Sequence, residues 1–348
     1  MKDSPQKKIS LKDIAQHAGV STALVSYVLN GKEKEYRVGK EIAIKIREIA
    51  KKLNYQPNHV AKSLRSGKTQ TIGLIIADIS NPFFANIARV VEDEARNNGY
   101  TVIIGSSDEN TDKSWTLLNV LINKQVDGFI IVSSENSESQ IYYLKERNIP
   151  FILLDRHFPN ISTDFVVIDN YKAAFDAGCN LIDGGYHNIG LIAYDSELFH
   201  MHERIRGYQG SLKHNDLFIH PEWLQKVNFN NIEKEIKIAI DKMLALDSPI
   251  NALIFTTYRL AVDGLKYLIE RNLKVPDDLA IVSFGQAEVF DLYSCPISYV
   301  KQPIDTLGRT AVDLFIKKLK KPKEEMIQIV MNAEIVSRRS SKAKDDRN

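Results

Sequence analysis

The sequence predicts a small all-α domain at the N-terminus, followed by a larger α/β domain built from two lobes. Residues 10–54 carry apolar side chains at helical spacing, whereas from Thr71 onward short apolar runs alternate with amphipathic stretches. A chain of 348 residues is long enough for two or three domains with buried cores. The balance of positive and negative residues also changes near residue 70. The first 70 residues carry 15 Lys and Arg against 6 Asp and Glu, and the remaining 278 carry 31 against 38.

A helix-turn-helix pattern covers residues 10–31. Ser10 and Asp13 have the spacing of a capping box, in which a hydroxyl and a carboxylate bind free amides of the first helical turn. Gly19 permits a sharp turn, and Ser21 is a good N-cap for a second helix. The apolar residues that this second helix is expected to bury are Leu24, Val25, Val28 and Leu29. Its opposite face is small and polar and consists of Thr22, Ala23, Ser26, Tyr27 and Asn30.

Such a second helix has the size and surface to enter the DNA major groove. A helical hairpin in an ordinary core would share the pattern, but it would not explain a net charge of +9 on the first 70 residues. Cationic side chains favour DNA because they release the counterions condensed on its phosphates. The sequence therefore predicts a DNA-binding domain at the N-terminus.

Two further helices are expected before the α/β domain. Residues 39–54 carry isoleucine and leucine at helical spacing and would complete a three-helix domain. Residues 57–67 begin with proline and end with glycine, which predicts a helix of about two turns. An isolated helix that short is unstable in water, so we expect it to form only when something packs against it.

The α/β domain is predicted from seven strand-like runs with amphipathic helices between them. The runs are 72–77, 101–105, 128–132, 151–154, 189–193, 252–255 and 279–284. The clearest helices are 84–97, 115–124, 232–246 and 260–271. Alternation of this kind indicates parallel sheets covered by helices on both faces. Ligands of such sheets bind beyond the carboxyl ends of the strands, so two lobes would form a cleft for a small molecule.

Several protein classes are disfavoured. No apolar run approaches the ~20 residues that cross a bilayer, and the N-terminus lacks the apolar segment of a secretory signal. Cys179 and Cys295 form no metal or redox motif, so a cytoplasmic location is expected. The absence of dinucleotide-binding, P-loop, nucleophile-elbow and zinc-protease motifs argues against an enzyme and against a cofactor. His200 and His202 lack ligand spacing and are expected in a surface loop. The basic first 70 residues and the missing export signal disfavour a transport protein.

From end to end, the chain resembles the LacI/GalR family of bacterial transcriptional regulators. The matching segments are Val20-Ser21, Val25-Ser26, Val28-Leu29-Asn30-Gly31, Leu53-Asn54-Tyr55-Gln56-Pro57-Asn58, Asp78-Ile79-Ser80-Asn81-Pro82-Phe83-Phe84, Leu154-Asp155-Arg156, Arg204-Ile205-Arg206-Gly207-Tyr208 and Lys301-Gln302-Pro303. The resemblance implies a homodimeric repressor with a periplasmic-binding-protein-like sensor domain. Such a repressor binds a near-palindromic DNA operator and is controlled by a small-molecule effector, which is a sugar, a sugar derivative or another metabolite.

The resemblance also implies which residues contact DNA. In the first two helices these are Ser10, Lys12, Ser21, Thr22, Ala23, Ser26, Tyr27 and Asn30; in the hinge they are Asn58, His59, Ala61, Leu64 and Arg65. Leu64 matches the family leucine that wedges between base pairs, although packing against its dimer mate is a compatible alternative. Tyr27 stands where the family often has arginine, so the operator sequence is not predictable.

Effector-binding residues implied by the resemblance and by the strand ends are Asp78, Phe83, Phe84, Asp155, Arg156, Asp169, Arg204, Tyr258 and Phe284. Structural roles compete with binding at several of them: Asp78 could cap a helix, Phe83 or Phe84 could be core, and Asp155 and Arg156 could form an ion pair. The family's second-lobe carboxylate is absent, because Gly285 occupies its place. An ordinary free sugar is thereby disfavoured. A ligand that stacks on Tyr258 or Phe284 and places an anion on Arg204 remains open, as does a pocket that binds nothing.

The expected domain boundaries follow from these patterns. The DNA-binding domain covers 1–56, the hinge 57–68 and the sensor domain 69–340. Within the sensor, lobe 1 takes about 69–168 and 301–328, and lobe 2 takes about 169–300 and 329–340. Residues 341–348 form a polar tail.

Overall fold

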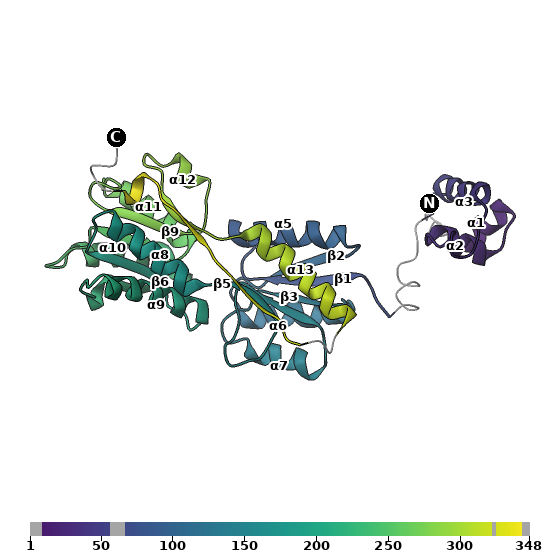
Figure 1. Ribbon diagram of the computed structural model, residues 1–348, viewed down its shortest axis with the longest axis horizontal. Coiled ribbons are helices and arrows are strands. Elements are labelled where there is room, and N and C mark those ends of the chain that lie inside the picture. The colour runs from purple at the N-terminus through teal and green to yellow at the C-terminus, as the bar shows by residue number, and fades with distance from the viewer. Residues whose placement is uncertain (1–8, 56–66, 322–324, 343–348) are drawn as a thin grey trace, which may run out of the picture. The chain divides into compact units, whose positions relative to one another are not determined.

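The computed structural model describes residues 9–55, 67–321 and 325–342. These residues belong to two compact units, Met1–Thr69 and Gln70–Asn348 (Figure 1). Nearly all of the predicted hinge, together with the last six residues of the chain, lies outside the described residues.

The first unit is a three-helix domain made of α1 (Leu11–Ala18), α2 (Thr22–Leu29) and α3 (Lys40–Lys52). Its core contains Ile14, Ala15, Ala18, Val25, Val28, Ala43, Ile46 and Ala50. Leu24 and Leu29, which were predicted to be buried with Val25 and Val28, are half-buried and pack against the edge of this core.

The predicted caps of α1 and α2 are confirmed. The Ser10 hydroxyl accepts a hydrogen bond from the Asp13 amide at 3.3 Å, and the Asp13 carboxylate accepts one from the Ser10 amide at 2.7 Å. Gly19 ends α1 with a φ of 70°, a left-handed conformation that glycine adopts without a Cβ clash. Ser21 caps α2, its hydroxyl accepting from the Leu24 amide at 3.2 Å.

The second unit contains two six-stranded sheets. The first has the order β11-β5-β4-β3-β1-β2 and is parallel throughout. Its strands are β1 (Thr71–Ile76), β2 (Thr101–Ser106), β3 (Gly128–Ile131), β4 (Phe151–Leu154), β5 (Phe165–Ile168) and β11 (Gln328–Met331). The second has the order β12-β10-β9-β8-β6-β7, in which β12 runs antiparallel to β10. Its strands are β6 (Ile189–Tyr194), β7 (Leu224–Val227), β8 (Ala252–Phe255), β9 (Ala280–Phe284), β10 (Ser298–Lys301) and β12 (Glu334–Val336).

Helices cover both faces of each sheet (Figure 1). The first sheet carries α5 (Pro82–Asn97) and α13 (Ile304–Lys320) on one face and α6 (Thr111–Asn123) and α7 (Glu138–Glu146) on the other. The second carries α8 (Asn170–Asp183) and α9 (Phe199–His214) on one face and α10 (Ile232–Leu244) and α11 (Tyr258–Glu270) on the other. Shorter helices are α12 (Val289–Leu292), η1 (Pro221–Trp223), η2 (Phe229–Asn231) and η3 (Arg339–Ser341).

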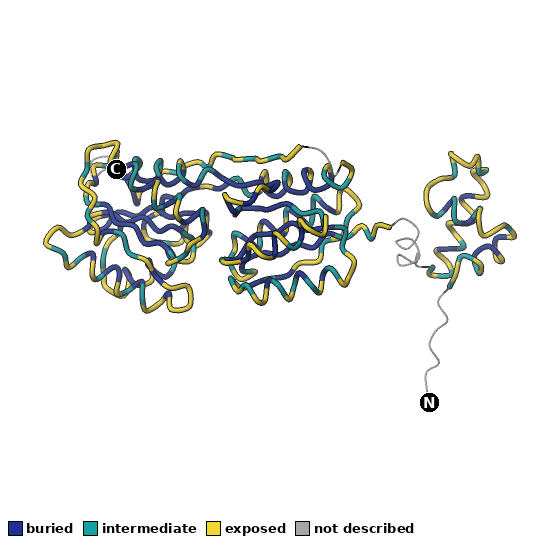
Figure 2. Tube along the Cα trace, turned by 90° about the horizontal axis from the view of Figure 1, so that it is seen from below, coloured by how far each residue is buried: buried dark blue, intermediate teal, exposed yellow. Residues whose placement is uncertain are grey.

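Alternating side chains of each strand supply two separate cores. Leu74 and Ile76 of β1 pack with α5 and α13, whereas Ile75 between them packs with α6 and α7. The central strands therefore lie in the buried interior of each lobe (Figure 2). Because the central strands of each sheet are buried on both faces, the polar groups of the cleft come from the segments that follow the strand ends.

The chain crosses between the lobes at 169, 302–303 and 332–333. The third crossing corrects our expectation that lobe 1 ends at 328. Residues Gln328–Met331 pair with β5, so this strand belongs entirely to the first sheet. Five of the six residues at 326–331 are apolar, a signal that could have identified this strand, although its side chains alternate between exposed and half-buried in the structure.

The predicted tail begins too early. Ser341 is buried, and its hydroxyl donates to the Asn180 side-chain oxygen at 2.6 Å. Neighbouring Ser340 is buried as well and donates to the carbonyl of Ile281 at 2.7 Å. These hydrogen bonds fix the end of the described chain to α8 and β9 of the second lobe.

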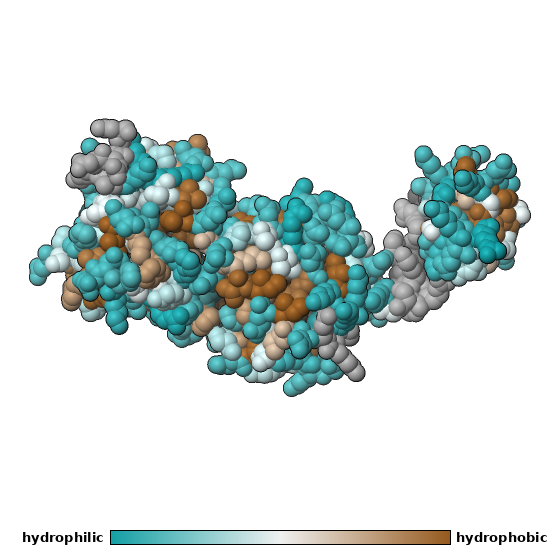
Figure 3. Space-filling view, in the orientation of Figure 1, coloured by the Kyte–Doolittle hydropathy of each residue, from teal (hydrophilic) through white to brown (hydrophobic). Residues whose placement is uncertain are grey.

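Among the described residues, no helix is long and apolar enough to cross a membrane. The face drawn in Figure 3 is mostly hydrophilic on both units, with apolar side chains gathered over the first lobe.

Candidate DNA-binding helix and ligand cleft

The outward face of α2 presents the polar side chains predicted to contact DNA. Thr22, Ala23 and Asn30 are exposed, and Ser26 and Tyr27 are half-buried. The Asn30 amide donates to the carbonyl of Ser26 at 2.7 Å and to its hydroxyl at 3.2 Å, which fixes the amide at the C-terminal end of the helix. The predicted contacts at the start of α1, Ser10 and Lys12, are also exposed.

Tyr27 has a partner that the sequence did not reveal. Its ring lies parallel to that of Tyr36, with centroids 3.7 Å apart and planes inclined by 2°. Tyr36 belongs to the turn that joins α2 to α3. The five predicted hinge contacts lie outside the described residues: Asn58, His59, Ala61, Leu64 and Arg65.

A cleft of about 530 Å³ lies between the two lobes of the sensor unit. Its walls are the segments that follow the strand ends, as expected for open parallel sheets. Asp78, Glu109 and Asp155 come from the first lobe, after β1, β2 and β4. Tyr194 and Phe284 end β6 and β9 of the second lobe.

At the floor of the cleft, Arg156 is bound by Glu109. One guanidinium nitrogen donates to Glu109 Oε2 at 2.7 Å and the other to Oε1 at 2.6 Å. Arg156 also donates to the carbonyl of Ser133 at 3.1 Å, and its Nε lies 3.7 Å from Asp155 Oδ2. Burial alone would lower the pKa of Arg156, but Glu109, Asp155 and Tyr194 together outweigh it and the pKa is raised. Arg156 is therefore a permanent cation at this site.

Asp155 is the carboxylate at the floor of the cleft that is not committed to a direct hydrogen bond with Arg156. Burial raises its pKa, while Arg156 and Arg204 oppose that change. Its φ of 66° is in the left-handed region, which is strained for a residue with a side chain.

Arg204 approaches from α9 of the second lobe. Its Nε donates to Asn170 Oδ1 at 2.8 Å, and one terminal nitrogen donates to the carbonyl of Thr256 at 2.7 Å. The guanidinium carbon lies 4.4 Å from the ring centroid of Phe284, so one face of that ring is covered. Burial lowers the pKa of Arg204 to about 10, with nearby Asp155 opposing, and the side chain stays charged at neutral pH.

His200 lies one turn before Arg204 on the same helix. It is buried, lines the cleft, and its Nδ1 has no hydrogen-bond partner. Burial lowers its pKa well below the usual value, and the charges of Arg156 and Arg204 act in the same direction. The expectation of a surface loop is wrong, because His200 and His202 both lie on the helix α9, where His200 is buried and His202 is exposed.

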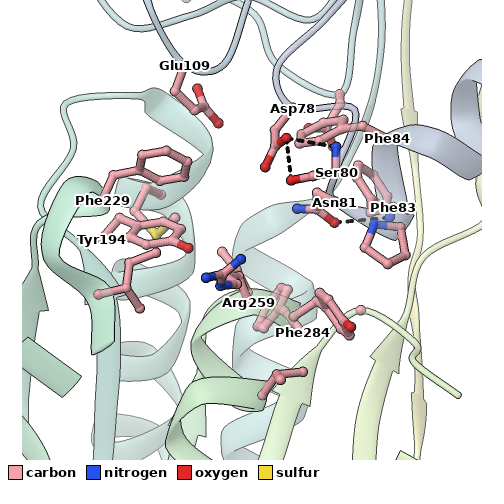
Figure 4. Close-up of a pocket in the computed structure, with 18 of the residues that line it drawn as sticks. Asp78, Ser80, Asn81, Phe83, Phe84, Glu109, Tyr194, Phe229, Arg259 and Phe284 are labelled. Atoms are coloured by element: carbon pink, nitrogen blue, oxygen red, sulfur yellow. Dashed lines mark hydrogen bonds between the residues drawn. The ribbon is translucent and has the colours of Figure 1, made fainter. Parts of the chain in front are cut away.

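The second lobe contributes an aromatic wall. Tyr194 and Phe229 meet edge to face with centroids 5.4 Å apart, and both point into the cleft opposite Asp78 and Phe84 (Figure 4). Burial raises the pKa of Tyr194 to about 12, so its hydroxyl is protonated. Tyr258 adds a further half-buried ring to this wall.

On the second lobe, two cations that line the cleft bind the carboxylate of Asp263. Asp263 accepts from Arg259 at 2.8 Å and from Lys266 at 3.3 Å, one bond to each carboxylate oxygen. On the other lobe, one oxygen of Asp78 accepts from the Ser80 amide at 2.8 Å and from its hydroxyl at 2.7 Å (Figure 4). The carboxylate of Asp78 points into the cleft from the first lobe.

Comparison with known proteins places this architecture in a family. Residues 69–338 match the family model of periplasmic binding proteins and the sugar-binding domain of the LacI family, and residues 10–58 match that of bacterial regulatory proteins of the lacI family. The chain belongs to the LacI family of bacterial regulatory proteins. The predicted fold class is confirmed, and so is the general function of DNA-binding transcriptional regulation.

Relatives of this LacI-family chain match it over nearly its full length. Catabolite control protein A of Priestia megaterium is 32% identical over 335 residues, which is 96% of this chain and 99% of that protein. The lac repressor dimer, solved with operator and the anti-inducer ONPF, is 20% identical and has a TM-score of 0.84, covering 97% of this chain and all of that one. A LacI-family regulator from Enterococcus faecium, solved with bound ribose, is 25% identical with a TM-score of 0.68 over 78% of this chain and 98% of that one.

One predicted effector residue of this LacI-family chain is wrong. Asp169 does not line the cleft; its carboxylate caps α8 by accepting from the Lys172 amide at 2.8 Å. An aspartate between a strand and a helix fits both roles equally well in sequence. Its neighbour Asn170 is the residue that reaches Arg204.

The other eight predicted effector residues line the cleft: Asp78, Phe83, Phe84, Asp155, Arg156, Arg204, Tyr258 and Phe284. Asp78 does not cap the following helix, since Asn81 does so by accepting from the Phe83 amide at 3.0 Å. Phe84 is buried in the core and also forms part of the wall.

Sequence reasoning missed Glu109, Tyr194, His200, Phe229 and the Arg259–Asp263 pair. Tyr194 and Glu109 follow strand ends, a signal that could have identified both. Phe229 begins η2, the short 3-10 helix that follows β7, a strand that was not predicted.

Proposed function

We propose that this protein is a homodimeric, effector-controlled transcriptional repressor that binds a near-palindromic operator through α2 of each protomer. The observation that carries the proposal is the combination, in one chain, of an exposed polar helix-turn-helix face and a cleft lined by buried, charged and aromatic side chains. Family membership supports both parts.

Dimerisation is supported by the edge of the first sheet. β2 is the outermost strand, and its Ile103 and Ile104 are 39% and 43% exposed, whereas the neighbouring strand β1 is almost completely buried. An exposed apolar edge strand is prone to pair with another chain unless it is covered. A second copy of this chain would cover it and place two α2 helices on matching half-sites.

We infer that the effector is a neutral molecule that offers hydroxyl or amide groups and an apolar ring face. At the floor of the cleft, Arg156 and Arg204 are balanced by Glu109 and Asp155, so an anion would compete with carboxylates already in place. Arg204 has also committed two of its nitrogens to Asn170 and to the backbone of Thr256. These bonds disfavour the anionic ligand considered from the sequence.

Hydroxyl recognition would depend on the first lobe. Gly285 supplies no side chain, and Asp263 is held by two cations, whereas Asp78 and Asp155 keep oxygens available. The aromatic wall of Tyr194 and Phe229 would take the apolar face of the ring. The ribose bound to the Enterococcus faecium regulator belongs to the same chemical class, so the free sugar that Gly285 disfavoured in the sequence becomes a candidate again.

Control would arise because the cleft lies between two lobes joined at three crossings. A ligand that binds one lobe arrangement more tightly shifts the population toward it, and the hinge helices of a dimer respond to that shift. Whether the effector releases or strengthens DNA binding follows from which arrangement it prefers. Leu64 is the hinge residue proposed to wedge between base pairs when the hinge helix is formed.

Footprinting of the full-length protein on genomic fragments tests this function. The expected result is a protected region with two-fold sequence symmetry whose half-sites lie about one helical turn apart. Protection that spreads over unrelated sequences, or that lacks paired half-sites, contradicts the proposal.

A further inference from the structure

The recognition helix carries an aromatic side chain that is held by a second one. Tyr27 lies on the outward face of α2, and its ring is stacked face to face on that of Tyr36 at a centroid distance of 3.7 Å. Tyr36 is 46% exposed, so the stack lies at the surface and not in the core.

The turn that presents Tyr36 is itself fixed in place. The Lys32 amide donates to the carbonyl of Tyr27 at 2.8 Å, and the Tyr36 amide donates to the carbonyl of Lys32 at 3.1 Å. Glu33 in the same turn forms an ion pair with Arg47 of α3. The turn that carries Tyr36 is therefore bound to both α2 and α3, and it holds the Tyr36 ring against that of Tyr27.

Such an arrangement removes side-chain freedom from Tyr27 before any DNA is bound. A tyrosine on an exposed helical face samples several rotamers, and ordering it on binding costs affinity. The parallel ring of Tyr36 lies against one face of Tyr27, which excludes rotamers that would enter that space. The hydroxyl and ring edge of Tyr27 are then held in one direction.

We infer that Tyr36 is a positioning residue for operator recognition, which fixes Tyr27 so that its hydroxyl and ring edge meet one base pair in each half-site. This inference rests on the DNA-binding role proposed for α2. Tyrosine offers a single hydroxyl and an apolar edge, a set that suits a base-pair edge with a thymine methyl better than the two acceptors of guanine. Specificity at that position would then depend on a residue that lies outside the recognition helix.

The test selects duplexes from a randomised pool with the full-length wild-type protein and then measures affinity for the selected duplex and for its single-base variants. Tyr36→Ala should lower affinity for the selected duplex by about 2- to 10-fold, the effect of freeing one side chain. At one base position in each half-site, the difference in affinity between the selected duplex and its single-base variants should become smaller. Affinity for a random duplex and the salt dependence should stay unchanged, because no phosphate contact is lost. Tyr36→Phe keeps the stack and should retain the wild-type preference.

Two further variants separate positioning from folding. Tyr36→Leu fills part of the same space without a flat ring and should behave like Tyr36→Ala. Ile44→Ala removes an exposed side chain of the same domain and should change nothing. In a Tyr27→Ala background, Tyr36→Ala should have no additional effect, because the two residues act as a unit.

The inference is overturned if Tyr36→Ala and Tyr36→Leu weaken all duplexes equally, or if both keep the full base preference. A wild-type protein that enriches no sequence contradicts the DNA-binding function itself, and this inference with it.

Discussion

Arg156 and Glu109 form a two-pronged ion pair, with N–O distances of 2.7 and 2.6 Å, between the segments that follow β4 and β2. The side chains are 8% and 20% exposed, so both charges are largely removed from water. Removing one partner of such a pair leaves the other charge buried and uncompensated. The pair thus holds together the first-lobe wall of the cleft.

Glu109→Ala should destabilise the sensor unit by about 3 kcal/mol, because Arg156 loses its main counter-charge. The melting temperature should fall by roughly 6–12 °C for a domain of this size. A matched control is Asp108→Ala in the same loop, where the ion pair with Lys113 is exposed and should contribute less than about 1 kcal/mol. An equal loss of stability in the two variants would show that the buried ion pair stabilises the unit no more than the exposed pair does.

Acidification should destabilise the sensor unit through His200. Burial lowers the pKa of His200 well below the ordinary value near 6.5, so the folded state keeps this side chain neutral while the unfolded chain takes up a proton. Stability is therefore complete above pH 6.5 and is lost as the pH falls below it, at up to about 1.4 kcal/mol per pH unit for this group. The charged or titratable groups acting on it are Arg156, Arg204, His157 and His202.

Thermal unfolding of wild type and His200→Gln between pH 7.5 and 5.5 measures this contribution. The difference in stability between the two proteins should shrink or change sign as the pH falls. Parallel pH profiles of the two proteins would mean that folding does not shift the pKa of His200, which would contradict this prediction.

The sequence predicted seven of the twelve strands in the described residues, because continuous apolar runs are a local signal. It missed β5 and β10, which are short and largely buried, and it missed β7, β11 and β12, whose mostly exposed and half-buried side chains are organised by pairing with neighbouring strands. In the cleft, Arg204 could be predicted from its motif. Glu109 could not be singled out, since its loop holds several polar residues and only the fold shows which one meets Arg156.

Phe229→Ala should weaken effector binding with little effect on folding. Phe229 is 36% exposed and its ring faces the cleft, so truncation removes a ligand contact and leaves no core cavity. A metabolite screen by thermal shift identifies a compound that stabilises the wild type. Calorimetry should then show an affinity at least about 10-fold lower for the variant, as expected for a buried aromatic contact.

Phe218→Ala provides the matched control for that measurement. Phe218 is 70% exposed and does not line the cleft, so its removal should leave affinity unchanged. A wild-type affinity in Phe229→Ala would exclude the aromatic wall from ligand recognition.

Leu64→Ala should abolish tight operator binding while leaving weak, salt-sensitive binding to any duplex. The leucine side chain is expected to unstack a base step and so to stabilise the hinge helix on bent DNA. Specific binding generally exceeds non-specific binding by 10³-fold or more, so a loss of about 100-fold or more is expected in gel-shift titrations. Val120→Ala, at an exposed position on α6, should have no effect. Operator affinity unchanged by Leu64→Ala would remove the wedge from the mechanism.

The most direct measurement of the central claim is the coupling between cleft and operator. Affinity of the full-length protein for its footprinted operator is measured with and without the metabolite that stabilises the sensor, and metabolite affinity is measured with and without the operator. Thermodynamic linkage requires the two ratios to be equal, and control of transcription predicts a ratio of about 5 to 150. If the protein binds both the operator and the metabolite, but neither ligand changes its affinity for the other, the account is contradicted.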